Sequence, residues 1–311
     1  SLGYATVIKK YHPDIIYSHF MSESSTMAYI VCKVLNLPLS ISAHAKDVLQ
    51  TNGPTKENVE LIKLKSEYVN FVSVCNKNAY NKILNSIDTK YHSKIHLEYH
   101  GIDSKKVLEK FKLAKPIKIY DINKLVLFTI GRFVEKKGFE YLIKAVKVLK
   151  DKNVDFVLFI AGAKGPLYQK IVSMINEFEL NDNVKILGNG EGVDFDTIIS
   201  YFKISDVFIL PSINTKSSDA DGIPNVLIES AIFGVPIITT DAGSITEFLV
   251  NEKDALIVKQ KDYKQIAEKI MLLNFNQKHK DYLVKNANKK AITMFDINKN
   301  VQKIEDLLLL N

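Results

Sequence analysis

The residues with the clearest chemical potential lie between positions 221 and 229. Asp221 and Glu229 are two carboxylates eight positions apart, with Gly222 and Pro224 between them. Proline suits the first turn of a helix, so Pro224 predicts a helix start and places Glu229 about one and a half turns inside it. The unpaired N–H groups of a first helical turn bind anions. The pattern therefore predicts a phosphate at the helix tip and a hydroxyl-binding carboxylate behind it, which is the chemistry that a nucleotide-sugar requires.

Two cations and a histidine add to this prediction. Arg132 and Lys137 flank a turn between an expected strand and a helix that starts near Gly138. Arginine binds phosphate oxygens through two parallel hydrogen bonds and lysine adds a mobile charge, which suits a nucleoside diphosphate that leaves with negative charge. His44 follows an expected strand, and Asp47 is predicted to orient its ring. The alternatives are two solvated loop cations and a structural histidine at a strand end.

Three segments resemble one enzyme family. DGIPNVLIESAIFGVPIITTDAGSITE, residues 221–247, resembles the E-x7-E segment of the family 4 glycosyltransferases, which are retaining enzymes with the GT-B fold, although Asp221 stands where the first Glu is usual. FTIGRFVEKKGFEYLIKAV, residues 128–146, resembles the G-R-x4-K-G segment of that family, and SAHAKD, residues 42–47, resembles the segment with its active-site histidine. The three matches fall in the order of the family and span nearly the whole chain.

The resemblance implies a role for each matching residue. It implies catalytic roles for His44 and Asp221, and a base-side loop at GAKGP with Gly162 and Gly165. The implied donor-binding residues are Arg132, Lys137, Gly222, Ile223, Pro224, Asn225, Val226 and Glu229. The implied reaction moves a sugar from a nucleotide-sugar donor to a hydroxyl of a saccharide or lipid-linked acceptor, by front-face departure and attack, in surface polysaccharide or glycolipid synthesis. It implies no metal and no cofactor.

Other interpretations stay open at this point. Asp221 also fits an N-terminal cap of the helix, and Asp219-Ala220-Asp221 is a D-x-D sequence that binds a divalent ion in another glycosyltransferase class. Glu229 also fits an exposed helix carboxylate. For the whole chain, the alternatives are a non-catalytic nucleotide-binding remnant or subunit and a GT-B enzyme of another class, such as an epimerase or a phosphorylase.

Short apolar, β-rich runs alternate with helical patterns along the chain, which predicts doubly wound α/β domains with parallel strands covered on both faces. The expected strands of the first set are 14–20, 39–44, 70–75 and 95–101, and those of the second set are LVLFTIG, 154–162, VKILGN, 206–212, 235–241 and 254–260. The clearest helix is GFEYLIKAVKVLKD, with apolar residues at helical spacing. Because ligands bind at the carboxyl ends of parallel strands, the candidate residues are expected at one edge of each sheet, facing a cleft between the domains.

The expected fold is GT-B, with two Rossmann-like domains. The first is predicted over 1–113, the nucleotide-sugar-binding domain over 114–290, and a helix that crosses back to the first domain over 291–311. The charged stretch 103–124 is expected to connect the domains. The chain begins at Ser1 within helix-like sequence, whereas family members place several strand–helix units before this point, so the first domain is expected to be incomplete.

Composition limits the possible number of domains, the compartment and the kinds of partner. The 311 residues are 46% hydrophobic and 25% charged, which is ordinary for a globular protein of two domains. Cys32 and Cys75 sit in apolar sequence and are expected to be buried and reduced, as in a cytoplasmic protein. The net charge of +7 reflects abundant surface lysine or, in a sharper interpretation, peripheral contact with an anionic inner membrane surface. No spanning helix and no nucleic-acid-binding pattern are predicted.

Overall fold

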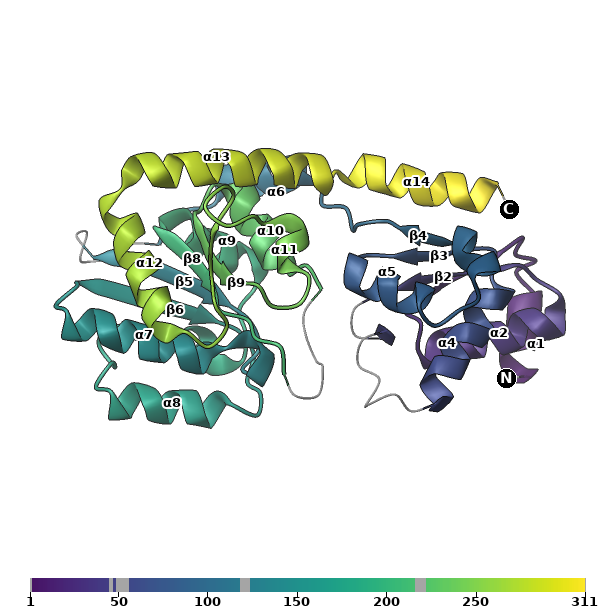
Figure 1. The fold of residues 1–311 in the computed structure, drawn as a ribbon, viewed down its shortest axis with the longest axis horizontal. Helices are drawn as coiled ribbons and strands as arrows, with labels where there is room; N and C mark the ends of the chain where they lie inside the picture. The colour runs from purple at the N-terminus through teal and green to yellow at the C-terminus, as the bar shows by residue number, and fades with distance from the viewer. Residues whose placement is uncertain (1, 45–46, 49–55, 118–123, 216–221, 311) are drawn as a thin grey trace. The chain divides into compact units, whose positions relative to one another are not determined.

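The computed structural model describes residues 2–44, 47–48, 56–117, 124–215 and 222–310. The chain folds into two compact units. Unit 1 consists of Ser1–Ile102 and Phe295–Asn311 together with Gly222, and unit 2 consists of Asp103–Thr215 and Ile223–Met294. Figure 1 shows the elements of both units.

Unit 1 is built around a four-stranded parallel sheet with the order β1-β2-β3-β4. Its strands are β1 (Ile16–His19), β2 (Leu39–Ala43), β3 (Val72–Val74) and β4 (Ile95–Leu97). Its helices are α1 (Leu2–Lys9), α2 (Glu23–Leu35), α4 (Lys56–Tyr68), α5 (Lys77–Leu84), the 3-10 helix η1 (Thr89–Lys94) and α14 (Ile297–Leu309). The expected strand–helix alternation is therefore present in this part of the chain.

The two faces of the unit 1 sheet differ. Strand register places His19, Ser42, Ser73 and His96 in one row across the sheet, while Ile41, Val72 and Ile95 belong to an apolar row. The apolar face packs into a buried cluster with α2, α4 and α5. The expectation of strands covered on both faces holds for β2 and β3, which are buried at every position, although alternate positions of β1 to β3 carry hydroxyl and imidazole groups.

Unit 2 is built around a six-stranded parallel sheet with the order β10-β9-β8-β5-β6-β7. Its strands are β5 (Leu125–Ile130), β6 (Phe156–Ala161), β7 (Val184–Ile186), β8 (Val207–Leu210), β9 (Ile237–Thr240) and β10 (Leu256–Val258). Its helices are α6 (Ser104–Leu113), η2 (Glu135–Lys137), α7 (Phe139–Asp151), α8 (Tyr168–Glu177), η3 (Leu187–Gly190), α9 (Phe195–Ile204), α10 (Asn225–Phe233), α11 (Ile245–Phe248), α12 (Tyr263–Phe275) and α13 (Gln277–Met294). The strand order reverses between β5 and β8.

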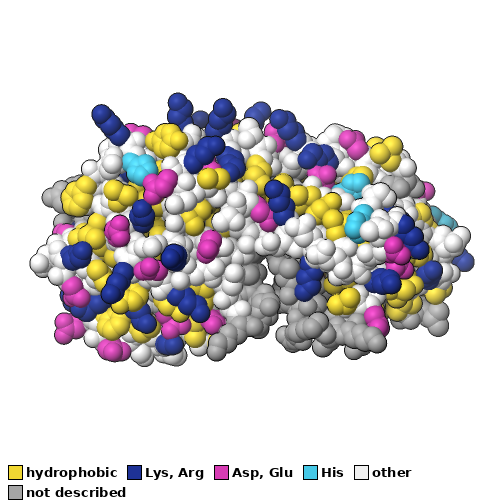
Figure 2. Space-filling model, viewed as in Figure 1, with side chains coloured by type: hydrophobic (Ala, Val, Ile, Leu, Met, Phe, Trp, Pro, Cys, Tyr) yellow, Lys and Arg dark blue, Asp and Glu magenta, His cyan; other side chains and the backbone are white. Residues whose placement is uncertain are grey.

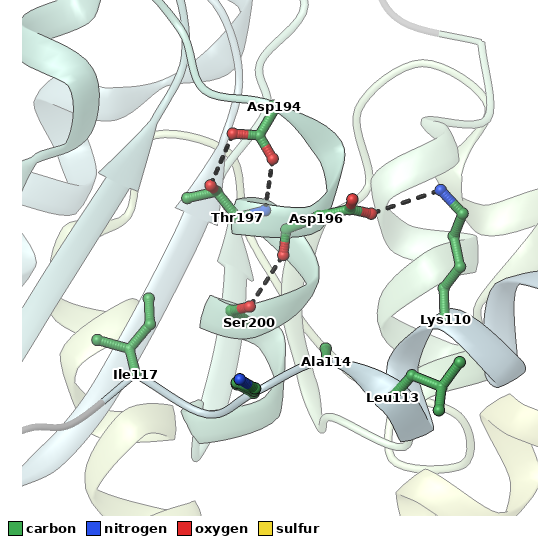
Figure 3. A pocket seen from close by; sticks show the side chains of 9 residues that line it. Lys110, Leu113, Ala114, Ile117, Asp194, Asp196, Thr197 and Ser200 are labelled. Carbon is green, nitrogen blue, oxygen red and sulfur yellow. Dashed lines mark hydrogen bonds and ion pairs between the residues drawn. The ribbon is translucent and has the colours of Figure 1, made fainter.

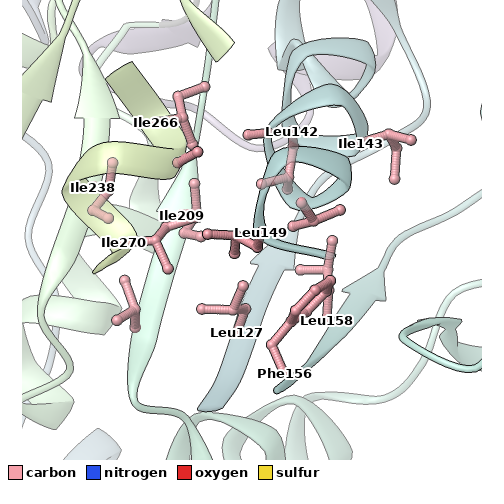
Figure 4. Packing of buried hydrophobic residues seen from close by; sticks show 14 of the residues in the cluster. Leu127, Leu142, Ile143, Leu149, Phe156, Leu158, Ile209, Ile238, Ile266 and Ile270 are labelled. Carbon is pink, nitrogen blue, oxygen red and sulfur yellow. The ribbon is translucent and has the colours of Figure 1, made fainter. Parts of the chain in front are cut away.

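Both faces of the unit 2 sheet are apolar and covered. One face packs against α7, α8 and α12 through aliphatic side chains such as Leu127, Leu142 and Ile270 (Figure 4). The other face carries Phe128 and Phe208, which contact Phe202 of α9. This is the doubly wound arrangement that the sequence predicted, with helices on both sides of a parallel sheet.

Two expectations about local structure are wrong. Residues 104–113, expected within the domain connection, form α6 and pack in unit 2, where Phe111 stacks on Phe233 at 4.6 Å and Lys203 Nζ donates to the Phe111 carbonyl. Alternating charges hid the apolar side of this helix. Cys75, expected in the core, is half-buried directly after β3, whereas Cys32 is buried as expected.

Candidate functional site

The loop after β5 presents the two cations singled out by the sequence. Arg132 is exposed two residues beyond the strand, and η2 follows it and ends at Lys137. The stem of Lys137 lies across Gly131, where an added Cβ would sit 3.0 Å from Lys137 Cδ. Arg132 is also the only arginine in a chain whose lysines and arginines number 42. A planar guanidinium is therefore confined to the position where bidentate phosphate binding was predicted.

Glycines hold three loops together at this edge of the sheet. Gly138 has φ +67°, and a Cβ there would lie 1.9 Å from the Pro211 carbonyl oxygen in the loop after β8. A Cβ on Gly162, in the loop after β6, would lie 1.9 Å from the Gly131 carbonyl oxygen, and Gly165 approaches the β5 loop in the same way. The backbones touch because these residues lack side chains. The loops after β5, β6 and β8 are therefore fixed against one another by sterics.

This edge coincides with the reversal of strand order. β5 and β8 are neighbours from which the chain winds outward in opposite directions, and ligands of doubly wound sheets bind beyond the carboxyl ends at such a point. Ile213 N–H, after β8, donates to the Lys136 carbonyl at 2.9 Å and joins the two loops again. The geometry thus brings Arg132 and Lys137 to the place where the fold favours a ligand.

Helix α10 begins at the same edge. Its first residue is Asn225 and Pro224 precedes it, so the predicted helix start is confirmed to within one residue. Asn225 is exposed, Gly222, Ile223 and Val226 are half-buried, and Pro224 is buried. Asp221, and with it the D-x-D sequence, lies outside the described residues. The helix runs back from the carboxyl edge towards β9, so its N–H-rich end points to the ligand side.

Glu229 lies on the second turn of α10 among apolar neighbours. Leu227, Ile228 and Ala231 are buried, and Glu229 itself is half-buried. Burial raises the pKa of the Glu229 carboxyl above its ordinary value. A partly dehydrated carboxylate gains more from accepting hydroxyl hydrogen bonds than an exposed one does. The exposed-carboxylate alternative for Glu229 is therefore disfavoured.

In unit 1, His44 lies directly after β2 with 9% of its surface exposed. Asp47 does not act on its ring as predicted. Instead, the Asp47 carboxylate accepts the backbone N–H of His44 at 2.8 Å and the backbone N–H of Met21. Asp47 thereby fixes the loops after β1 and β2 together, because one carboxylate can accept from both backbones. Asp47 and His44 therefore interact as predicted, but through the backbone N–H of His44 and not through its ring.

Residues that no spacing in the sequence groups together surround His44. The rings of His19 and His100 lie 4.5 and 4.9 Å from the His44 ring, between centroids, and Cys75 completes the group. Burial, with His100 and His19 nearby, lowers the pKa of His44 to about 4, and burial also lowers the pKa of His100. The sequence signal that could have grouped these residues is their position, since each of the four ends or follows one of the four strands of the sheet.

A pocket of about 370 Å³ opens beside this group, wholly within unit 1. The sheet supplies the polar wall, with Tyr17, Ser42 and Ser73 in addition to the imidazoles, and α14 supplies Val301, Ile304 and Leu308 as an apolar wall. The Asn300 side chain donates to the His100 carbonyl at 3.2 Å and anchors α14 at the pocket. The pocket can therefore hold a ligand with a polar and an apolar part.

A second cavity, of about 500 Å³, lies in unit 2 between α6 and α9 (Figure 3). Its carboxylates have structural partners, since Asp194 accepts the Thr197 N–H at 2.8 Å as the cap of α9 and Asp196 pairs with Lys110 at 3.4 Å. The carboxylates of this cavity therefore stabilise the fold of α9 and its contact with α6, and they need no ligand to account for them.

Among the helices that the structure describes, none has the length and hydrophobicity of a transmembrane span.

Comparison with known proteins places this geometry in a family. The family model for glycosyl transferases group 1 matches residues 110–290, more than half of the 311 residues. WcaL of Escherichia coli, whose name assigns it to colanic acid biosynthesis, is 30% identical over 170 residues that cover 54% of this chain and 40% of WcaL. CapH of Staphylococcus aureus, a capsular polysaccharide biosynthesis glycosyltransferase, is 24% identical over 309 residues that cover 97% of this chain and 79% of CapH.

The fold has solved counterparts. HepE of Anabaena, crystallised with UDP, superposes with a TM-score of 0.80 at 18% identity, over 99% of this chain and 82% of HepE. Such a likeness concerns the fold, which is that of GT-B proteins. The chain spans half or less of the length of the first curated relatives that it matches. The family match covers all of α7 to α12, with Glu229 in α10, and the loop that carries Arg132, and the chain belongs to the glycosyl transferases group 1.

Proposed function

We propose that the chain is a retaining glycosyltransferase of the family 4 type, which moves a hexose from a nucleotide-sugar to an acceptor hydroxyl in surface polysaccharide or glycolipid synthesis. The names of WcaL and CapH support the process, and HepE, solved with UDP and with UDP-glucose, supports the donor class. The observation that carries the proposal is the reversal of strand order between β5 and β8, where Arg132, Lys137 and the start of α10 meet.

In this proposal unit 2 binds the donor. Arg132 and Lys137 bind the diphosphate, and the first N–H groups of α10 add the positive end of the helix dipole. Glu229 accepts hydrogen bonds from sugar hydroxyls. Gly162 and Gly165 line the side of the base, where their lack of side chains lets the ligand approach the backbone.

The proposed chemistry follows from charge. As the bond between sugar and diphosphate breaks, negative charge grows on the leaving phosphate oxygen, and preorganised cations stabilise it more in the transition state than in the ground state. The leaving oxygen then takes the proton of the acceptor hydroxyl on the same face of the sugar. Arg132 and Lys137 supply the positive charge, so the proposal includes no metal or cofactor. Asp221 is proposed to contact the transferred sugar, and His44 of unit 1 is proposed as a second catalytic residue.

Nucleotide binding is the direct test. Calorimetric titration of the chain with UDP, GDP and ADP should give saturable binding of at least one of them. Arg132→Ala should weaken it by about 1.5–3 kcal/mol through loss of charge-assisted hydrogen bonds. Arg132→Lys should recover only part of this loss, because lysine keeps the charge without the planar fork. Lys152→Ala, at an exposed position after α7, is the matched control.

The outcomes separate the alternatives. Absence of binding of all three nucleotides in the millimolar range, or an effect of Lys152→Ala equal to that of Arg132→Ala, would refute the donor site. Binding without sugar transfer to any acceptor would favour the non-catalytic nucleotide-binding alternative. The proposed contact with an anionic membrane surface does not depend on these outcomes.

A further inference from the structure

The polar face of the unit 1 sheet continues past the ends of its strands. Past the ends of β2, β3 and β4, next to the row His19–Ser42–Ser73–His96, lie His44, Cys75 and His100. One ligand atom from each of these last three residues lies within 4.8 Å of the others. We propose that this group is a binding site for a zinc ion, held by His44, Cys75 and His100.

The spacing suits such an ion after a small adjustment. Zinc bonds of 2.0–2.3 Å in a tetrahedron place ligand atoms about 3.3–3.8 Å apart, so the three side chains need to close by about 1 Å. His100 keeps an exposed part, although its imidazole is partly shielded from solvent, and Cys75 is half-buried, so rotation about their side-chain bonds is open to both. The pocket beside the group gives an ion access from solvent.

The donor set selects the kind of ion. Two imidazoles and one thiolate are the ligands of zinc and its neighbours, whereas magnesium and calcium prefer oxygen. Of the two glutamates that line the pocket, Glu98 forms an ion pair with Lys303 Nζ at 3.1 Å. Zinc binding would release the Cys75 thiol proton to solvent as the sulfur–zinc bond forms.

An unpaired atom points to the same site. His44 Nδ1 is buried and has no hydrogen-bond partner among the described residues, which is a costly condition for a polar atom. A coordinated ion would replace the missing partner or draw the ring into a paired orientation. His19 stands next to His44, and its Nδ1 is within 2.9 Å of Ser42 Oγ, a contact that fixes its ring. A tetrahedral zinc ion needs a fourth ligand, which would be the His19 imidazole or a water molecule.

This inference does not depend on the proposed transferase function. It concerns an ion that unit 1 binds without nucleotide or acceptor. Zinc would occupy the lone pair of the His44 imidazole that the proposed transferase reaction uses, and it would take no part in that reaction. The alternative is a set of imidazoles that pack edge-on and tilted against one another and bind no ion, and metal titration distinguishes the two.

Cobalt is the spectroscopic probe for the site. The metal-free chain, kept reduced with a phosphine, is titrated with Co²⁺, and one equivalent should give a sulfur-to-cobalt absorption that Zn²⁺ abolishes and Mg²⁺ does not. Cys75→Ser should lose this band. Cys32→Ser should keep it, because Cys32 is buried in α2 and is the only other cysteine. A band that survives in Cys75→Ser, or no saturable binding, would overturn the proposal.

Protection from alkylation tests the site without any substitution. Cys75 should react with iodoacetamide in the metal-free chain and be protected by one equivalent of zinc, as mass spectrometry of the two cysteine peptides would measure. Burial raises the pKa of Cys32 to about 11, so that thiol is an unreactive internal control. Equal alkylation of Cys75 with and without zinc would contradict the proposal.

Substitution of the imidazoles completes the test. His44→Ala and His100→Ala should each weaken zinc binding by at least about tenfold, as loss of a ligand does at least as much as loss of its supporting contacts. His92→Ala is the control, since His92 lies in η1 and its Nε2 contacts the Leu84 carbonyl. Equal loss in the control, or unchanged affinity in both ligand variants, would overturn the assignment.

Discussion

In unit 2, glycines let three loops touch at the carboxyl edge of the sheet, whereas the same edge of unit 1 is filled by histidines, a cysteine and serines. The unit 2 site is thus shaped by backbone, with Arg132, Lys137 and Glu229 as its few charged groups. The unit 1 site is shaped by side chains that titrate. The difference indicates that substitution at glycine should damage the first site most, and that protons and metal ions should affect the second.

The largest effect is expected for Gly138→Ala. A Cβ at Gly138 would lie 1.9 Å from the Pro211 carbonyl oxygen, and the φ of +67° is unfavourable for alanine. We expect a loss of about 2–5 kcal/mol in the free energy of unfolding, from backbone strain and overpacking together. Urea denaturation followed by circular dichroism measures it, with nucleotide affinity as a second readout.

Gly3→Ala is the matched control for that substitution. Nothing lies within 4 Å of a Cβ at Gly3, which is within α1. We expect no loss of stability there and a gain of up to about 1 kcal/mol from helix propensity. A Gly138→Ala protein as stable as the parent would show that the loops of unit 2 are not fixed by glycine contacts.

The sequence predicted the parts of the fold that depend on local pattern. Apolar runs predicted each strand that the structure describes, and the spacing of Phe139, Leu142, Ile143, Val146 and Leu149 predicted α7. The candidate residues of unit 2 were predictable because a glycine, a cation or a proline next to a strand has a local meaning. Helix α6 was missed because its stabilising contact, Phe111 on Phe233, joins distant positions.

The unit 1 cluster was missed for a related reason. His19, His44, Cys75 and His100 come together only through the parallel register of four strands, and no local spacing encodes that register. The serines of β2 and β3 looked like minor polar breaks in apolar runs, while their alternation made a polar face. Asp47 was linked correctly to His44, but whether a carboxylate meets a ring or a backbone N–H is decided by loop geometry.

The next effect is expected at Glu229. Glu229→Gln keeps the size of the side chain and removes the charge, so it should weaken nucleotide or nucleotide-sugar binding by about 1.5–3 kcal/mol, the range of a hydrogen bond to a charged group. Glu177→Gln, at the end of α8, is the control. Asp221→Asn is expected to act mainly on turnover, and equal loss of nucleotide affinity in both variants would contradict this division.

Unit 1 should respond to acid through His44. Its pKa in the fold is about 4, below the ordinary 6.5, so between these values the unfolded chain binds more protons and stability falls as the pH is lowered. His100 and His96, whose pKa values burial also lowers, act in the same direction. Asp47, whose pKa burial raises, opposes them. After allowance for solvent in the open pocket, we expect about 1 kcal/mol from His44.

Thermal melts between pH 7 and pH 4 check this expectation. His44→Asn should flatten the dependence below pH 6.5, because the titrating group is gone. His12→Asn is the control, since His12 is exposed and its φ of 47° is one that asparagine tolerates. Parallel curves for the parent and His44→Asn would show that the unit 1 edge does not titrate as its burial implies.

The smallest effect is expected on the outer face of α13 in unit 2. Lys278, Tyr282, Lys285 and Lys289 are exposed at helical spacing, and lysine side chains gather along the α13 edge (Figure 2). An aromatic residue among lysines suits the surface of an anionic membrane, where each lysine contributes about 1 kcal/mol or less. Single Lys→Glu changes at 278, 285 and 289 should each lower partition to anionic vesicles several-fold and leave neutral vesicles unaffected. Lys152→Glu and Lys185→Glu, exposed elsewhere in unit 2, are the controls, and an equal loss in them would attribute the binding to net charge and not to this helix.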